Sequence, residues 1–432
     1  MPFEKGPLSG RSSRANSPFS KTFNIIFLHF IPCGFYVYTY STDQWRLNVI
    51  KKKVLMQYPP FDLVRLLKTV FEPEVGERIA ILIDLPHPEK IQGFSFLKDP
   101  AFPIQNKAHD VFYQGLKNGG MAALGLKGGE IFAYQLSGGS NLDFSDEAYD
   151  PSGKKLSLKA DVYSQYDIIL CISTYSATAP LTAFAKEIGF RGATLHGVND
   201  IILASGLAVD YNQVSVQAEK LRLSMTKADY IEIDFVMEGS KYTLKLNCDG
   251  QEAQKSHGLC RGKIPDIANL PAGEVYFVPT DASGEFPHRY EEGTLAVMEV
   301  SGGKIRKSRL IRGDEKIVAA HNLKLQTDPV TGELGELGFG TQILPVSGKD
   351  IQDEKILGTM HVATGRSDHL GGHLTPDKFA IPINATHDDL LFSPTKTPEI
   401  NVPEVRMFRD QKSVVLIQNY QPATYLQQAL LS

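Results

Sequence analysis

The 432-residue sequence predicts a two-domain α/β protein. Apolar runs of strand length alternate with amphipathic segments up to about residue 228, and short strand-like runs separated by glycine-rich turns follow from about residue 230. Alternation of strands and helices indicates a largely parallel sheet. We therefore expect an N-terminal α/β domain over 56–235 with a largely parallel sheet, and a C-terminal domain over 236–432 with a mixed sheet.

The first domain is predicted from its hydrophobic periodicity. ERIAILIDL (77–85) is apolar almost throughout, which is typical of a strand buried on both faces. The acidic segment 143–155 contains Gly and Pro and predicts a surface loop. The same patterns predict further strands over 130–136, 166–174 and 191–198, and helices over 57–70, 107–124, 180–188, 199–207 and 211–228.

The second domain is predicted to consist mainly of strands with few long helices. Its expected strands are YIEIDF (230–235), KYTLKLN (241–247), EVYFVP (274–279), TLAVMEV (294–300) and KIRKSRLI (304–311).

Residues 1–55 look like an extension to this enzyme-sized body. Residues 1–22 are rich in Ser, Pro, Gly, Lys and Arg, and an apolar, aromatic stretch of about 18 residues follows over 23–40, at the lower limit for a membrane-spanning helix. Three interpretations are open: an idle tail or a translation start upstream of Met56, a membrane anchor, or a signal peptide. The first is favoured, because Met56 directly precedes a helix–loop–strand pattern.

Composition and charge exclude several classes of protein. The 45 basic and 49 acidic residues give a net charge of −4, which argues against a general binder of nucleic acid or of anionic membranes. The four cysteines form no CxxC pair, so we expect free thiols in a cytoplasmic protein. GxGxxG after a strand, GxxxxGK[ST], GxSxG and HExxH are all missing from the sequence, which disfavours dinucleotide binding, phosphate-loop, serine-hydrolase and zincin chemistry.

Carboxylates and histidines in the second domain are the candidate functional residues. Glu274 begins an apolar strand after a Leu-Pro-Ala-Gly turn, Glu336 lies among glycines in GELGFGT, and His361 follows a strand-like run. His387 and Asp389 are two apart, so in an extended segment they share one face. Three carboxylates and two histidines suit a pair of divalent ions that activates a bridging water.

At these residues the sequence resembles a known family. NLPAGEVYFVP, GTLAVMEV, GELGFGT, DEKILGTMHVATG and HDDLLF, in this order, resemble the aminopeptidase T-like (aminopeptidase S/T, leucyl aminopeptidase) metallopeptidases, most clearly over 265–392. The resemblance implies a homodimeric metalloaminopeptidase-like hydrolase, a protease that removes N-terminal residues from a peptide or acts on a small molecule. It implies two divalent ions, zinc, cobalt or manganese, held in this catalytic domain by Glu274, Glu336, His361, His387 and Asp389.

The chain departs from the family pattern at two positions. Asp368 stands where family members commonly have a tyrosine, and Gln342 stands where asparagine is usual. Asp368 and His369 are our candidate catalytic general bases, and with His373 they either surround the ligands in an altered way or form a different acid–base apparatus. His196 is expected to be structural, although it could line the cleft between the domains.

Two alternatives follow from the same residues. His361, His387 and Asp389 are a two-histidine, one-carboxylate set, the ligand type of mononuclear iron(II) oxygenases, and the motifs more distantly resemble ring-cleaving dihydroxypyridine dioxygenases. Retention of Glu274 and Glu336 favours two metals over one. A relative that is not a peptidase, with an unknown substrate or no catalysis, is the second alternative, motivated by the missing tyrosine.

Overall fold

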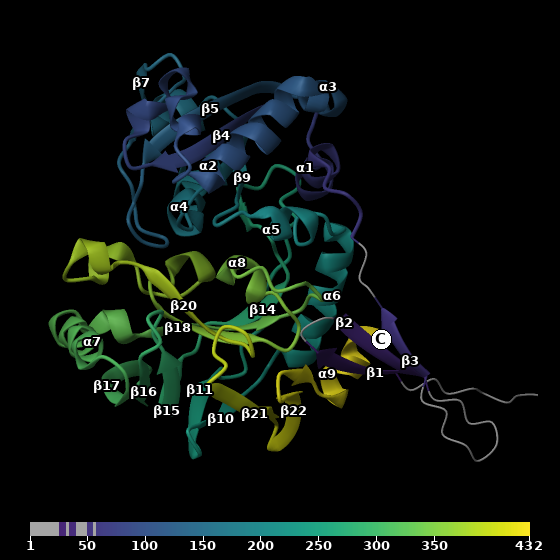
Figure 1. The fold of residues 1–432 in the computed structure, drawn as a ribbon, viewed down its shortest axis with the longest axis vertical. Coiled ribbons are helices and arrows are strands. Elements are labelled where there is room, and N and C mark those ends of the chain that lie inside the picture. The colour runs from purple at the N-terminus through teal and green to yellow at the C-terminus, as the bar shows by residue number, and fades with distance from the viewer. Residues whose placement is uncertain (1–25, 32–33, 40–49, 55–57) are drawn as a thin grey trace, which may run out of the picture. The chain divides into compact units, whose positions relative to one another are not determined.

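The computed structural model describes residues 26–31, 34–39, 50–54 and 58–432 (Figure 1). The chain divides into two compact units, Met1–Gln57 and Tyr58–Ser432. In the first unit, β1 (Ile26–Ile31), β2 (Gly34–Thr39) and β3 (Ile50–Val54) form an antiparallel sheet in that order. The apolar stretch 23–40 therefore contains two strands where it is described, and the rest of the predicted extension lies outside the described residues.

No helix in the described part of the chain combines the length and the apolar character needed to span a bilayer.

The second unit begins with a seven-stranded sheet in the order β13-β9-β8-β4-β5-β6-β7. The pairs from β13 to β5 are parallel, and β6 and β7 add an antiparallel edge. The chain returns to this sheet late, because β13 pairs with β9 after three strands of the two other sheets have formed. The strands are β4 (Arg78–Leu85), β5 (Lys127–Gln135), β6 (Glu147–Tyr149), β7 (Lys155–Ser157), β8 (Ile168–Ile172), β9 (Arg191–Thr194) and β13 (Ile267–Asn269).

Helices cover both faces of the parallel sheet, which explains its apolar strands. Ile79, Ile81 and Ile83 of β4 enter one core, and the alternating Ala80 and Leu82 enter the other. Successive side chains of a strand point to opposite faces, so a strand between two cores has to be apolar at every position. The helices are α1 (Leu63–Phe71), α2 (Pro103–Lys107), α3 (Met121–Leu124), α4 (Thr178–Ile188), α5 (Asp200–Ala204) and α6 (Tyr211–Met225).

Two antiparallel sheets make up the later part of the chain. They share one core, in which Phe392 of the smaller sheet contacts Phe235 and Phe286 of the larger, with ring centroids 4.8 and 6.2 Å apart. The larger sheet has the order β17-β16-β15-β11-β10-β21-β22-β23, and the smaller has the order β12-β14-β18-β19-β20.

The bounds of these strands are as follows. The larger sheet contains β10 (Tyr230–Met237), β11 (Ser240–Asn247), β15 (Asp281–Arg289), β16 (Leu295–Ser301), β17 (Lys304–Arg312), β21 (Ile400–Arg409), β22 (Lys412–Gln418) and β23 (Gln421–Pro422). The smaller contains β12 (Gln254–Ser256), β14 (Glu274–Phe277), β18 (Leu334–Gly340), β19 (Met360–Gly365) and β20 (His387–Phe392). The helices here are α7 (Glu315–Thr327), α8 (Asp350–Asp353) and α9 (Thr424–Leu431).

The predicted α/β fold class is confirmed, with differences in detail. The helix expected over 107–124 is a series of helical turns from α2 to α3, interrupted at Asn118 and Gly119, where Gly119 has a φ of 112°. The expected loop 143–155 contains β6 and the start of β7, and α7 was not predicted. The boundary at residue 235 stays a prediction. Cys171, Cys248 and Cys260 are buried free thiols, and Cys33 lies outside the described residues.

Candidate metal centre

The five predicted ligands lie on four neighbouring strands of the smaller antiparallel sheet. Glu274 is the first residue of β14, as the turn before it predicted, and Glu336 lies on β18. His361 lies on β19 and pairs with Leu391 of β20. His387 and Asp389 share one face of β20. Adjacent strands therefore bring together residues that are up to 115 positions apart in the sequence.

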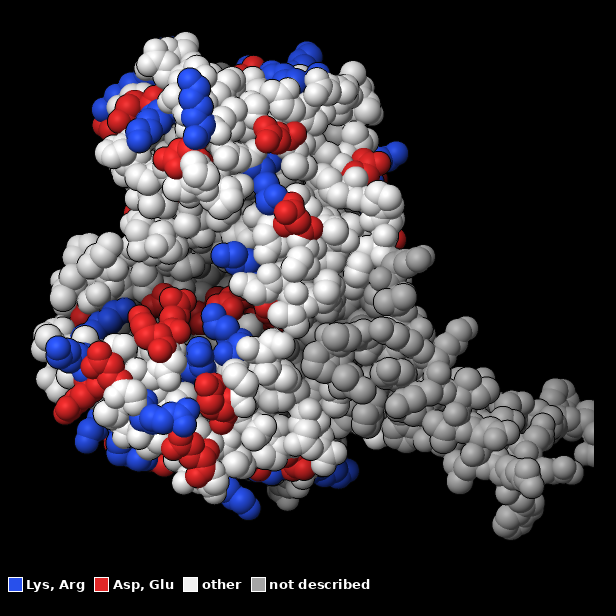
Figure 2. Space-filling view, viewed as in Figure 1, with Lys and Arg blue, Asp and Glu red and all other residues white. Residues whose placement is uncertain are grey.

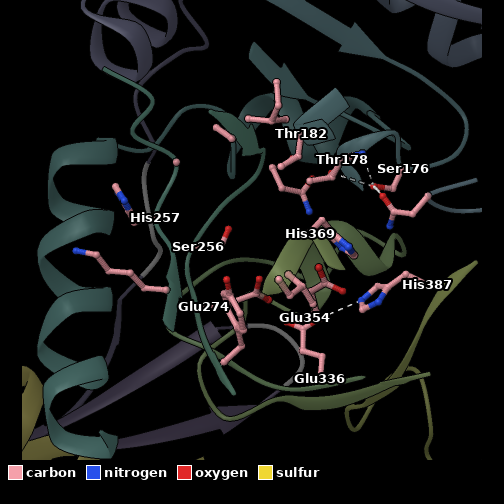
Figure 3. Close-up of a pocket in the computed structure, with 18 of the residues that line it drawn as sticks. Ser176, Thr178, Thr182, Ser256, His257, Glu274, Glu336, Glu354, His369 and His387 are labelled. Atoms are coloured by element: carbon pink, nitrogen blue, oxygen red, sulfur yellow. Dashed lines mark hydrogen bonds and ion pairs between the residues drawn. The ribbon is translucent and has the colours of Figure 1, made fainter. Parts of the chain in front are cut away.

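The side chains of these residues converge. His387 Nε2 lies 3.0 Å from Glu336 Oε2 and 3.3 Å from Asp389 Oδ1. His361 Nε2 lies 3.6 Å from Glu336 Oε1, 3.8 Å from Asp389 Oδ1 and 4.0 Å from Glu274 Oε2. Glu336 thus contacts both imidazoles, one with each oxygen. Figure 3 shows Glu274, Glu336 and His387 gathered on one side of a cavity.

A glycine makes room for one of the imidazoles. Gly338 pairs with His361 across β18 and β19, and a Cβ atom on Gly338 would lie 2.1 Å from His361 Cε1. Real Cβ atoms do not approach so closely, so any other residue at position 338 would displace the ring. The glycine-flanked acid in GELGFGT is explained by this close approach of backbone and imidazole.

The other imidazole is oriented by the backbone. His387 Nδ1–H donates to the carbonyl oxygen of Arg366 at 2.6 Å, which leaves Nε2 free to face the carboxylates. Histidine ligands of metals are commonly fixed in this way, because the bond at one ring nitrogen selects the tautomer at the other.

The carboxylates of Glu336 and Asp389 favour positive charge on the groups around them. Burial by itself lowers the pKa of His361, but Glu336 and Asp389 beside it raise that pKa to about 10. The pKa of His387 is also raised, against the effect of burial, by Asp389 and Glu336. Burial would raise the pKa of Glu336, yet the two imidazoles lower it overall. Protonated histidines thus supply the positive charge that a bound cation would supply here.

A buried lysine was not anticipated from the sequence. Lys355 is 1% exposed, and its Nζ donates to Glu274 Oε2 and to Glu354 Oε1, both at 2.6 Å. Burial, with Asp389 and Glu274 nearby, raises the pKa of Glu354 to about 8 against the influence of Lys355. Glu354 and Lys355 are adjacent in the motif DEKILGTMHVATG. Two opposite charges directly before an apolar run were the sequence signal that could have indicated a buried ion pair.

The two predicted catalytic residues have different surroundings. Asp368 receives two hydrogen bonds from Arg366, at 2.7 Å from Nε and 3.2 Å from Nη2. Burial would raise the pKa of Asp368, but the neighbouring His369 and Arg366 lower it overall. His369 lines the cavity, with its ring edge-on to that of His387 and the centroids 5.0 Å apart. His373 is 81% exposed and pairs with Glu333 at 2.9 Å. The catalytic roles of Asp368 and His369 stay predictions.

The cavity has a volume of about 210 Å³ and opens between the metal-site strands and residues of the parallel-sheet half. Hydroxyl-bearing side chains form the facing wall, as Figure 3 shows for Ser176, Thr178 and Thr182. His196 also lines it, and its Nδ1 is buried without a hydrogen-bond partner in the part of the chain that the structure describes. Figure 2 shows a hollow on one face of this unit with acidic side chains beside it.

The donor set fits a metal ion. Asp389 Oδ1 is buried and has no hydrogen-bond partner among the described residues, so this carboxylate oxygen is available to a metal ion. Two donors about 2.1 Å from one ion lie at most about 4.2 Å apart. The distances from Glu336 to His361 and His387 (3.6 and 3.0 Å) and from Asp389 to the same two residues (3.8 and 3.3 Å) satisfy this limit. Two groups of three close donors occur among the described residues: Glu274, Glu336 and His361, and Glu336, His387 and Asp389.

Comparison with known proteins gives a fold relationship. No family model matches the chain, and no curated protein matches it. A solved structure, the 2,5-dihydroxypyridine dioxygenase from Pseudomonas putida KT2440, is similar with a TM-score of 0.52 and 12% sequence identity. The similarity covers 84% of this chain and 97% of the dioxygenase chain.

The expected membership in the aminopeptidase T-like family is therefore wrong. No family model supports it, and the structural similarity is to a dioxygenase. The descriptions hydrolase, aminopeptidase, metallopeptidase and protease are withdrawn with it. The motifs predicted the wrong family because they mainly reflect the positions of glycines, carboxylates and histidines on one scaffold. Enzymes with different reactions can share such a scaffold. A metal cofactor is supported by the donor groups. Two ions, their identity as zinc, cobalt or manganese, a cytoplasmic location and a homodimer stay untested predictions.

Proposed function

We propose that the chain is a metal-dependent dioxygenase that opens a hydroxylated aromatic ring, with one iron(II) ion held by His361, His387 and Asp389. The observation that carries the proposal is that Asp389 Oδ1 lies 3.8 Å from His361 Nε2 and 3.3 Å from His387 Nε2, so one carboxylate oxygen lies close to both imidazoles. Two histidines and one carboxylate leave coordination positions open for substrate and dioxygen, the arrangement typical of non-haem iron(II) oxygenases.

The fold similarity supports the same choice. At 12% identity it concerns the fold, so the substrate of the similar protein enters only as the first compound to test. The cavity of about 210 Å³ corresponds to about seven water molecules at roughly 30 Å³ each. That volume suits a single substituted ring.

Each nearby residue has a role in this proposal. The bound iron supplies the one-electron chemistry that dioxygen requires. His387 keeps Nε2 directed at the centre through the bond from Nδ1 to Arg366, and Glu336 lies beside Nε2 of both imidazoles, the nitrogens that would face the ion. The hydroxyls of Ser176 and Thr178 can orient the ring substituents from the facing wall. His369, whose imidazole lines the cavity, can accept a proton from a ring hydroxyl.

The test is oxygen consumption by the iron(II)-loaded protein, prepared anaerobically. A panel of hydroxylated pyridines and benzenes, beginning with 2,5-dihydroxypyridine, is followed by an oxygen electrode and by loss of ring absorbance. We expect one O₂ consumed per ring opened, with both atoms of ¹⁸O₂ recovered in the product. His387→Ala should remove the activity, and the matched His373→Ala variant, altered at an exposed histidine, should keep it.

A folded, iron-loaded protein that consumes no oxygen with any member of the panel contradicts the proposal. Incorporation of a single labelled oxygen atom also contradicts it, because that outcome describes a monooxygenase.

A further inference from the structure

We propose that the ammonium group of Lys355 takes the place of a second metal ion, so that the centre binds one divalent ion per chain. This inference rests on the proposed function and deepens it, because it specifies the cations that the same site contains.

The position of Lys355 follows from the two overlapping donor groups. Glu274, Glu336 and His361 form one, and Glu336, His387 and Asp389 form the other, with Glu336 in both. Such a pair with a shared carboxylate has the composition of a two-ion site. Lys355 Nζ lies 2.6 Å from Glu274 Oε2, the oxygen that lies 4.0 Å from His361 Nε2 in the first group. In the second group, Asp389 Oδ1 has no hydrogen-bond partner among the described residues, and it lies 3.8 Å from His361 Nε2, so an ion on this side of Glu336 can also take His361 as a ligand.

Charge makes the lysine and an ion at the first group mutually exclusive. Lys355 and Glu274 are both buried, so water screens the repulsion between an ammonium and a divalent ion only weakly. Lys355 also neutralises Glu354, whose Oε1 lies 2.6 Å from Nζ. The positive charge of one lysine thus compensates two buried carboxylates, a role that a metal ion would otherwise have.

Backbone contacts fix the main chain at Lys355, and Glu274 and Glu354 hold its ammonium group. The Lys355 carbonyl accepts from Gln342 N at 2.8 Å, and the Lys355 N–H donates to Gln352 O at 3.0 Å. The chain around it presses on Gly340, where a Cβ atom would lie 2.1 Å from Ile356 O and 2.6 Å from the Lys355 carbonyl carbon. Thr359 Oγ1 also donates to the carbonyl of Ile356 at 2.7 Å.

One consequence concerns the chemistry available to the centre. Two-ion hydrolases place a water between their ions and lower its pKa with both charges. An ammonium cannot ligate water as a Lewis acid, so the lysine removes that route. It leaves a single ion with open positions, as the proposed oxygenase requires.

The direct test is metal counting on the full-length wild-type protein. Protein stripped with a chelator is titrated with Mn²⁺ alone, the bound metal is counted by elemental analysis, and paired ions are sought by electron paramagnetic resonance. We expect one ion per chain and the spectrum of an isolated ion. Two ions per chain, or a spin-coupled pair, would overturn the proposal.

Variants test the role of the lysine itself. Lys355→Met should raise the count from one to two, because it opens the position beside Glu274. The double variant Lys355→Met, Glu354→Gln removes one buried charge of each sign. Its metal content is counted in place of the single variant's if the single variant does not fold. The exposed Lys378→Met is the control and should bind one ion. A folded variant without Lys355 that still binds one ion contradicts the proposal, and if neither variant folds the wild-type count decides.

Failure here can be distinguished from failure of the proposed function. A wild-type protein with one ion but no oxygen consumption would reject the dioxygenase and retain the role of Lys355. A protein with two ions would reject the role of Lys355, and oxygen consumption would still decide the reaction.

Discussion

Gly338 and His361 face each other across β18 and β19, so closely that a Cβ atom on the glycine would lie 2.1 Å from the imidazole. We expect Gly338→Ala to displace the ring and weaken metal binding by about 10- to 100-fold, the loss typical when a ligand's orientation is disturbed. Isothermal titration with Mn²⁺ measures the affinity.

A double-mutant comparison separates this effect from general damage to the sheet. With His361→Ala present, the added Gly338→Ala change should cost little further affinity, because no ring remains to be displaced. Equal losses in both backgrounds would show that the glycine serves the strand and not the imidazole.

His369 and Asp368 should differ in their effect on turnover. His369 lines the cavity, whereas the Asp368 carboxylate is held by Arg366. We expect His369→Gln to lower kcat by about 10²- to 10⁴-fold, the usual contribution of a general acid or base, with little change in bound metal. Asp368→Asn should lower it less than about tenfold. If Asp368→Asn is the more harmful variant, with metal content unchanged, the assignment of roles is reversed.

Metal removal should destabilise the protein. The centre contains buried carboxylates and imidazoles that an ion compensates, so the ion binds the folded state preferentially. At a free metal concentration of about 100 Kd, the expected gain is about 2.7 kcal/mol. Thermal unfolding with and without chelator measures the gain, and Asp389→Asn should abolish most of it. A metal-dependent rise in Tm that survives in Asp389→Asn would place the binding site elsewhere.

Two histidines away from the centre should make stability depend on pH. Burial and the neighbouring His321 and Lys396 lower the pKa of His288 to about 3, and burial with Lys324 lowers that of His321 to about 4. Unfolded histidine titrates near 6.5, so below that pH the unfolded chain binds more protons. Their stabilisation is complete above about pH 6.5 and is lost as the pH falls toward the native values.

The size of this effect is about 1.4 kcal/mol per pH unit for each histidine. Urea unfolding of metal-free protein at pH 7 and pH 5 measures it. His321→Gln removes one titrating group while keeping a partner for Tyr290, whose hydroxyl lies 2.7 Å from His321 Nδ1. The variant should lose less stability between the two pH values than the wild type. Equal losses would mean that His321 does not titrate as its burial indicates.

The sequence was sufficient where the controlling interactions are local. The start of β14 at Glu274 and the shared face of His387 and Asp389 follow from a turn and from strand periodicity. The side chains of β4 point alternately into two cores, and this arrangement likewise follows from the continuous apolar run in its sequence.

The sequence was insufficient where distant segments meet. Lys355 contacts Glu274 across 81 positions, and no local pattern reports which carboxylate a lysine will reach. α7 was missed because it buries little apolar surface, chiefly Val318 and Leu325, and so its helical periodicity is weak. The incorrect assignment to a peptidase family has the same cause. The sequence shows the types of the candidate ligand residues, but it does not show that Lys355 lies beside them.

Arg366 joins the two walls of the cavity. Its carbonyl accepts from His387 Nδ1, while its guanidinium donates to the Asn141 carbonyl and to Asp143, each at 2.8 Å. Asn141 in turn receives hydrogen bonds from Ser176 and from Ala179 N. One residue therefore sets both where the metal ligand points and where the facing hydroxyls stand. A substitution of Arg366 would therefore disturb both walls of the cavity at once, whereas Ser256 and His257 line it without a hydrogen bond to Arg366.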